Sequence, residues 1–204
     1  TAQRDFRVAL NALLSALEPD RPARADSFYI VREGLAYGLN PHSGYWLDAD
    51  EFERLASEGL ALGERRQEEQ ARDALNQAVE LYHGEFLAEL RYEDWCSEER
   101  ERLQVLYLRA LEWLAQDAAR RGWYERCVRL CEQILACDHC WEEAYRLLMH
   151  SHFRLGNRAM ALRTYEKCVQ NLRDELGVSP MASTTRLYER IRRSAARQAA
   201  QDDA

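Results

Sequence analysis

Two stretches of equal length decide the fold: YLRALEWLAQDAARRG at residues 107–122 and WEEAYRLLMHSHFRLG at residues 141–156. They begin 34 residues apart and match at an aromatic, a small, a leucine and a glycine position. The matching positions are Tyr107, Ala110, Leu114 and Gly122 in the first stretch, and Trp141, Ala144, Leu148 and Gly156 in the second. A period of 34 residues is typical of tetratricopeptide repeats, in which each repeat is a pair of helices.

A second helix is predicted after each glycine, because small and aromatic residues recur at the same offsets in both copies. These are Cys127, Cys131 and Ile134 in one copy, and Ala161, Tyr165 and Cys168 in the other. Glycine ends a helix in a conformation that other residues resist, and small side chains let paired helices approach closely. Each pair leaves an apolar face that a neighbour must cover. We expect a less regular pair at 64–96, with Leu75, Val79, Tyr82, Phe86 and Trp95, at one end, and a helix with Leu187, Tyr188 and Ile191 at the other.

Helical periodicity dominates from about residue 50 onward. One helix is predicted to start at Asp50 and run to Glu58, and others at 64–83, 97–121, 123–137, 141–155, 157–175 and 181–199. The predicted fold class is therefore mainly α, a tetratricopeptide-like repeat in the form of an αα-superhelix.

The first 47 residues differ in composition from the rest of the chain, since they contain three of the four prolines. A short amphipathic helix from Phe6 to Leu17 is stopped by Pro19. Two runs of β-forming residues, at 28–31 and 35–39, flank Gly34 and predict a β-hairpin. We expect one domain at residues 1–47 and a second at residues 48–200.

Composition limits the classes of function. The net charge is −7 and the pI about 5.4, so the chain lacks an overall basic field, and any contact with DNA needs a local patch. No long uncharged apolar run and no signal-like N-terminus is present, which favours a cytoplasmic protein without a membrane partner. A phosphate loop, a nucleophile elbow and a two-histidine helix motif are all missing, so we predict no enzyme activity, no catalytic residue and no cofactor.

Five residues between 127 and 140 admit a zinc site as one interpretation. Cys127, Cys131, Cys137, His139 and Cys140 supply suitable ligand atoms at close spacing, and Cys137 with Cys140 could also form a redox pair. The repeat favours ordinary packing, because Cys127 and Cys131 occupy inward positions of a helix and the others fall in a turn. We therefore predict no metal site.

Three passages resemble the sequences of a known family: AVELYHGEFL at 78–87, WCSEERER at 95–102 and YEKCVQNLRDELGVSP at 165–180, followed by Leu187-Tyr188. Over about residues 48–193 the chain resembles the bacterial transcriptional activator domain of antibiotic-pathway regulators. The preceding part is similar to the end of a response-regulator-type winged helix, with a recognition-like helix at 5–17 and a wing hairpin.

The resemblance to a winged helix implies candidate DNA contacts at Arg4, Arg7 and Asn11, although solvated side chains are the simpler interpretation. Late in this helix the family usually carries basic residues, and Ala12, Leu14 and Ser15 stand there instead. Such side chains cannot neutralise a phosphate or pair with guanine. DNA binding is therefore expected only through a more complete winged helix.

The candidate binding site is the concave surface that stacked helix pairs create, lined mainly by the first helix of each pair. The candidate residues on it are Arg109, Gln116, Arg120, Arg146, His150 and Arg154, which could receive an acidic peptide, a phosphate-bearing ligand or a nucleotide, or could form a solvated charged stripe. The family resemblance implies a regulatory interaction domain whose partners are other domains of the parent regulator, the transcription machinery or a second copy. The alternative is an effector-sensing domain that binds a small molecule in the groove.

Overall fold

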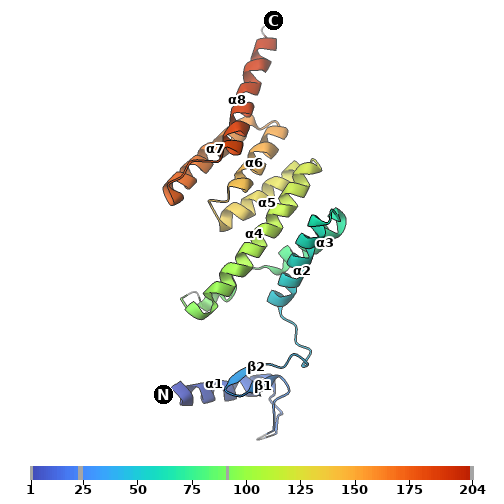
Figure 1. Cartoon of the computed structure of the whole chain (residues 1–204), viewed down its shortest axis with the longest axis vertical. Coiled ribbons are helices and arrows are strands. Elements are labelled where there is room, and N and C mark those ends of the chain that lie inside the picture. The colour runs from blue at the N-terminus through green and yellow to red at the C-terminus, as the bar shows by residue number, and fades with distance from the viewer. Residues whose placement is uncertain (1, 23–24, 91, 203–204) are drawn as a thin grey trace. The chain divides into compact units, whose positions relative to one another are not determined.

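The computed structural model describes residues 2–22, 25–90 and 92–202, with side chains through Ser194, and divides into two units at Leu47 and Asp48. The first unit contains helix α1 (Ala2–Leu17) and strands β1 (Ile30–Glu33) and β2 (Ala36–Leu39). The second contains helices α2 to α8 and short helical turns (Figure 1). The chain is thus mainly helical with one small antiparallel sheet, as the sequence predicts.

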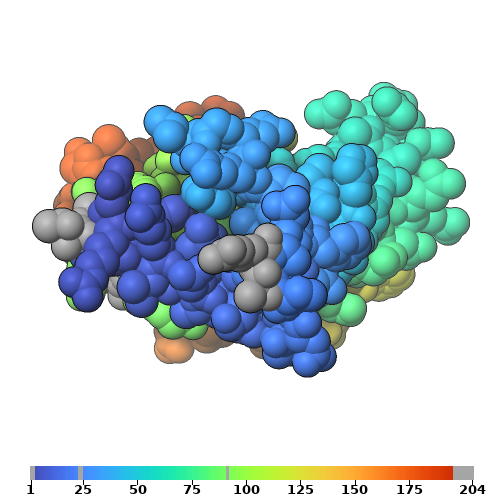
Figure 2. Space-filling view, turned by 90° about the horizontal axis from the view of Figure 1, so that it is seen from below, coloured from blue at the N-terminus to red at the C-terminus, as the bar shows by residue number. Residues whose placement is uncertain are grey.

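The N-terminal unit is a helix followed by a β-hairpin. Ile30 pairs with Leu39 and Glu33 with Ala36, and the turn between the strands contains Gly34 at φ +61°. Glu18 joins the end of α1 to the start of the hairpin, since its carboxylate accepts hydrogen bonds from the Ser27 hydroxyl and the Phe28 N–H. Both hydrogen bonds favour the ionised form and lower the pKa of this carboxyl. None of the side chains described in this unit is fully buried; α1 and the hairpin appear in blue in Figure 2.

The helical unit is built from antiparallel helix pairs in sequence order. The pairs are α2 (Asp48–Glu64) with α3 (Glu68–Leu81), α4 (Ser97–Arg120) with α5 (Tyr124–Cys137), and α6 (Glu142–Arg154) with α7 (Arg158–Asn171). Helix α7 continues into a wider turn, η3 (Leu172–Leu176), and α8 (Ala182–Asp202) follows. Figure 1 shows each pair following the previous one from α2 to α8.

Both predicted glycine stops are confirmed. Gly122 and Gly156 have φ values of +78° and +79°, the left-handed conformation that glycine adopts without a Cβ clash. After each glycine the next N–H reaches back to the ending helix: Trp123 donates to the Ala118 carbonyl and Asn157 to the His152 carbonyl, both at 2.8 Å. This backbone pattern closes the helix and reverses the chain.

The predicted first pair at 64–96 is wrong, because the pair is α2 with α3 at residues 48–81. Helix α2 runs through Gly59 and Gly63, and the reversal occurs at Arg66, a non-glycine residue with φ +60°. Gly59 lets the two helices touch, since a Cβ there would lie 2.6 Å from the Leu75 side chain. The sequence contains no glycine at the turn, so the stop signal used for the other pairs was missing.

Residues 82–90 and 92–96 belong to a connection with two short turns, η1 (Ala88–Leu90) and η2 (Asp94–Cys96), where the sequence predicts a second helix. Trp95 is 70% exposed and covers no neighbour, contrary to our expectation. Arg100 on α4 holds the connection by donating hydrogen bonds to the backbone carbonyls of Phe86 (2.9 Å), Leu87 (3.3 Å) and Leu90 (3.2 Å). The WCSEERER passage therefore serves to fasten this segment.

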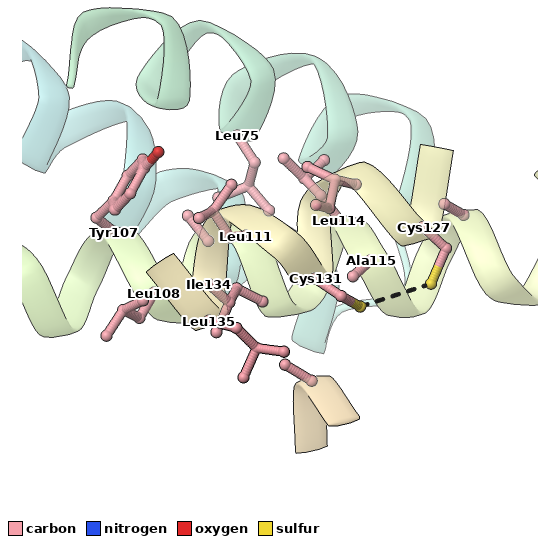
Figure 3. Packing of buried hydrophobic residues seen from close by; sticks show 14 of the residues in the cluster. Leu75, Tyr107, Leu108, Leu111, Leu114, Ala115, Cys127, Cys131, Ile134 and Leu135 are labelled. Carbon is pink, nitrogen blue, oxygen red and sulfur yellow. Dashed lines mark hydrogen bonds between the residues drawn. The ribbon is translucent and has the colours of Figure 1, made fainter. Parts of the chain in front are cut away.

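The main core lies where α2, α3, α4, α5 and α6 meet (Figure 3). Leu75, Leu111, Ile134 and Tyr145 are almost fully buried in it. A smaller core of Met149, Ala161, Leu187 and Ile191 joins α6, α7 and α8. Leu187 and Ile191 are buried, so α8 covers the end of the stack as predicted. No helix in the described ranges has both the length and the apolar composition that crossing a bilayer requires.

Candidate interaction surface

One face of the helical unit is formed by the first helices of successive pairs. The backbones of α2 and α4, of α4 and α6, and of α6 and α8 lie close together. Between α3 and α5 the described residues show a side-chain hydrogen bond, from Arg126 to Asn76 (2.6 Å), but no such close backbone packing, and none is found between α5 and α7. Helices on the inner side of a curved stack lie closer together than those on the outer side. The face of α2, α4, α6 and α8 is therefore the inner one, and we call it the concave face.

The N-terminal half of the concave face contains two open clefts between α2 and α4. One has a volume of about 440 Å³ and the other about 400 Å³, and Arg109 lines both. The second cleft also contains Gln116 and the half-buried Trp113, whose indole lies against Gly63; a Cβ at Gly63 would be 2.3 Å from the Trp113 Nε1. Arg109 and Gln116, predicted as groove residues, thus share one cleft.

The polar groups of this half are largely bonded to one another. Glu112 accepts hydrogen bonds from the Gln116 amide (2.9 Å) and from the Trp141 indole N–H (2.6 Å), and so links α4 to α6. Arg102 forms a hydrogen-bonded pair with Glu53 on α2 (2.5 Å). These donors and acceptors have partners, whereas Arg109 is exposed and has no ion-paired carboxylate among the described side chains.

Arg120, a third predicted residue, lies at the end of α4. Its guanidinium stands 5.8 Å from the centroid of the Trp113 ring and 3.7 Å from the Asp117 carboxylate. Asp117 is only 1% exposed and also pairs with Arg121 (3.1 Å) and with Arg72 on α3 (3.3 Å). Sequence reasoning missed Asp117, because nothing in the spacing distinguishes it from the solvated carboxylates around it.

The C-terminal half contains a cleft of about 540 Å³ between α6 and α8, in which Arg146 and His150 lie. Arg146 is ion-paired with Glu143 and donates to the Ser183 hydroxyl (3.0 Å). Burial lowers the pKa of His150, and the positive charges of Arg154 and Arg190 lower it further. At neutral pH the histidine is therefore uncharged among arginines.

Arg154, the last predicted groove residue, packs over the Tyr124 ring at 5.0 Å from its centroid, and the same ring meets His150 edge-on at 5.9 Å. The six predicted residues consequently do not form one pocket. Arg109 and Gln116 share a cleft on α4, Arg146 and His150 share another on α6, and Arg120 and Arg154 stack on aromatic rings nearby. Sequence reasoning also missed Arg186 and Arg190 of α8, whose four-residue spacing was the available signal.

The cysteines are packing residues where the repeat predicts them to be. Cys127, Cys131 and Cys168 are fully buried, and the sulfurs of Cys127 and Cys131 lie 3.9 Å apart (Figure 3). A hydrogen bond donated by Cys131 to Cys127, together with burial, raises the pKa of the Cys131 thiol, whereas the same hydrogen bond lowers the pKa of Cys127. Cys137 is exposed in the following turn. No group of three or more His, Cys, Asp or Glu side chains suited to a metal occurs in the described parts of the chain.

The candidate DNA contacts lie on the N-terminal unit. Arg4, Arg7 and Asn11 are all exposed, and their three- and four-residue spacing puts them along one side of α1. The apolar residues Phe6 and Leu13 of this helix are also about half exposed. Whether these polar residues contact DNA stays a prediction.

Comparison with known proteins agrees with this architecture. The model of the family described as bacterial transcriptional activator domain matches residues 47–192. Regulatory protein AfsR of Streptomyces coelicolor is 30% identical over 185 residues, which cover 91% of this chain and 18% of AfsR, so the chain spans a small part of that relative's length.

Two solved structures show the same fold. EmbR of Mycobacterium tuberculosis, determined in complex with a low-affinity phosphopeptide, superimposes with a TM-score of 0.75 at 20% identity, covering 95% of this chain and 50% of that chain. The C-terminal tetratricopeptide-containing domain of a Plasmodium falciparum FK506-binding protein gives a TM-score of 0.57 at 13% identity, covering 75% of this chain and 95% of that chain. The predicted tetratricopeptide-like fold is confirmed.

Proposed function

Because the chain belongs to the bacterial transcriptional activator domain family and so to transcription regulation, we propose that its helical unit is a non-catalytic interaction domain. Its concave face holds a protein partner: another domain of the parent regulator, a component of the transcription machinery or a second copy of the chain. The N-terminal unit, residues 1–47, contributes to DNA binding as part of a larger winged helix.

The observation that carries this proposal is that open clefts recur along the concave face. Two clefts, of about 440 and 400 Å³, lie between α2 and α4, and a third, of about 540 Å³, lies between α6 and α8. Small-molecule sites usually enclose most of their ligand in one concavity. A row of shallow clefts over four helices suits an extended polypeptide better, because each cleft can receive a different side chain.

Site-specific photo-crosslinking tests this function in cells that produce the whole parent protein. A photoreactive amino acid replaces Arg109 on the concave face or, as a control, Gln170, an exposed residue of α7 on the other layer. We expect the Arg109 position to give covalent adducts with a regulator domain, a second copy or a transcription component, identified by mass spectrometry. Equal adducts at both positions, or none at Arg109, would refute the proposal.

Effector sensing is a second candidate, supported by cleft volumes within the range of small-molecule pockets. A ligand at one hundred times its dissociation constant stabilises a protein by about 2.7 kcal/mol. A metabolite or nucleotide that raises the melting temperature of the chain would therefore favour this candidate. If the concave face holds only a polypeptide, no member of such a panel changes the melting temperature.

A further inference from the structure

The α6–α8 cleft has a concentration of positive charge that contrasts with the net charge of −7 for the chain. Its walls carry Arg146, Arg186 and Arg190, and Arg154 lies one helical turn beyond His150. Glu143 is the only carboxylate among the lining residues. The cleft is therefore strongly basic although the protein is acidic.

Three of these four arginines have no ion-paired carboxylate among the described side chains: Arg154, which packs over the Tyr124 ring, and Arg186 and Arg190. Arg146 is occupied by Glu143 and Ser183. Arg186 and Arg190 have no carboxylate within ion-pair distance among the side chains described through Ser194, and both are exposed. Elsewhere on α8, Arg192 and Arg193 both pair with Glu189. Arg186 and Arg190 are thus charged groups available to a ligand, four residues apart on one side of the helix.

The floor of the cleft is apolar. Leu187 is 8% exposed and belongs to the smaller core, and Leu147 lines the same cleft from α6. A ligand that fits both the rim and the floor needs anionic groups on either side of an apolar side chain. The guanidinium group accepts a carboxylate in a two-hydrogen-bond geometry.

We propose that the α6–α8 cleft binds an acidic peptide segment of a partner protein, with carboxylates on Arg186 and Arg190 and an apolar side chain over Leu147 and Leu187. This inference rests on the proposed function, since it names the chemistry of the partner of the concave face. The charge distribution favours a peptide over a nucleic acid. The lining of the two α2–α4 clefts contains four glutamates, Glu64, Glu98, Glu101 and Glu112, against two arginines, Arg102 and Arg109. This excess of negative charge would repel a phosphate backbone continuing along the face.

Fluorescence anisotropy with defined probes tests the proposal on the whole chain. The probe is a labelled twelve-residue peptide of repeated Asp-Glu-Leu, with a repeated Asn-Gln-Leu peptide as the neutral control and a labelled DNA duplex as the competing class. We expect the acidic peptide to bind and the neutral peptide and the DNA to bind at least about tenfold more weakly, because charged hydrogen bonds are lost or the phosphates are repelled.

Two double variants with the same change in net charge separate the cleft from general electrostatics. R186Q/R190Q removes the free arginines, whereas R192Q/R193Q removes arginines that already pair with Glu189. The first should weaken peptide binding by about tenfold or more and the second by less than about twofold. Matching circular dichroism and melting temperatures verify that both variants fold.

Equal losses in the two variants, equal binding of the neutral peptide, tighter binding of DNA or no binding of the acidic peptide would each overturn the inference. Failure of the acidic-peptide inference can be distinguished from failure of the proposed function. Crosslinks from Arg109 report on the α2–α4 half of the face and do not depend on Arg186 or Arg190. Crosslinking without peptide binding would refute the acidic site alone.

Discussion

The two halves of the helical unit use charge differently. Around α2 to α4, Arg102 pairs with Glu53, and Glu112 links α4 to the start of α6. The buried Asp117 forms ion pairs with three arginines. Around α6 and α8 the core is small and Arg186 and Arg190 remain unpaired. A charge that already has a partner stabilises the fold, whereas an unpaired charge is available for binding. Apart from Arg109, which is exposed and unpaired among the described side chains, the pairing of arginines and not their number therefore distinguishes the α2–α4 half from the α6–α8 half.

The two halves should differ most in the free energy of unfolding that is lost when one central charged side chain is removed from each. Asp117→Ala leaves Arg72 and Arg121 without their buried carboxylate and should lower the free energy of unfolding by about 3 kcal/mol. Arg190→Ala removes an exposed, unpaired charge and should change it by no more than about 0.5 kcal/mol. Urea denaturation followed by circular dichroism measures both. Similar losses in the two variants would contradict the division of roles.

Helix packing in the first pair gives a second, smaller effect. A Cβ at Gly59 would lie 2.6 Å from Leu75 Cγ and 3.2 Å from the Ala71 carbonyl oxygen. Gly59→Ala should therefore lower the free energy of unfolding by about 1 to 2 kcal/mol, although alanine has the higher helix propensity. Gly38→Ala is the control, because an added Cβ there meets no atom within 4 Å. Stabilisation by Gly59→Ala would show that α2 and α3 can move apart freely.

The turns of the two halves differ by one residue type, which allows a reciprocal exchange. Arg66 adopts φ +60° at the end of α2, where the later turn has Gly156 at φ +79°. Arg66→Gly should raise the free energy of unfolding by about 0.5 to 1 kcal/mol, and Gly156→Ala should lower it by about 1 kcal/mol. Thermal and urea unfolding of the two variants check the signs. The same sign in both would mean that backbone strain at these turns has no measurable effect.

Sequence reasoning succeeded where one local rule determines the structure. The glycines at 122 and 156 and the inward positions of Cys127, Cys131 and Ile134 recur with the repeat, so the pairs after residue 97 could be predicted within a few residues. The first pair was mispredicted because Arg66 replaces the glycine signal and two glycines lie inside α2. Site prediction went less far. Which arginines are paired depends on contacts between distant residues, such as Arg72 with Asp117, that no spacing rule contains.

The smallest expected effect is a pH dependence of stability that arises from His150, and it depends on the unpaired arginines of the C-terminal half. His150 faces Arg146 and Arg154 on its own helix, Tyr124 on α5, and Arg190 on α8. Because burial and the positive charges of Arg154 and Arg190 lower the pKa of His150, the unfolded chain binds a proton more readily than the folded chain below about pH 6.5. This contribution to stability is present above the unfolded pKa and is lost as the pH falls through the folded pKa.

The measurement is the free energy of unfolding of the wild type and of His150→Gln between pH 7.5 and 5.5. We expect the wild type to lose stability more steeply than the variant on acidification. Arg154→Gln should reduce the steepness in part, because one of the charges that opposes protonation is removed while burial remains. A wild-type slope equal to that of His150→Gln would mean that counter-ions or other groups already neutralise the arginines of this half, and the contrast with the α2–α4 half would then disappear.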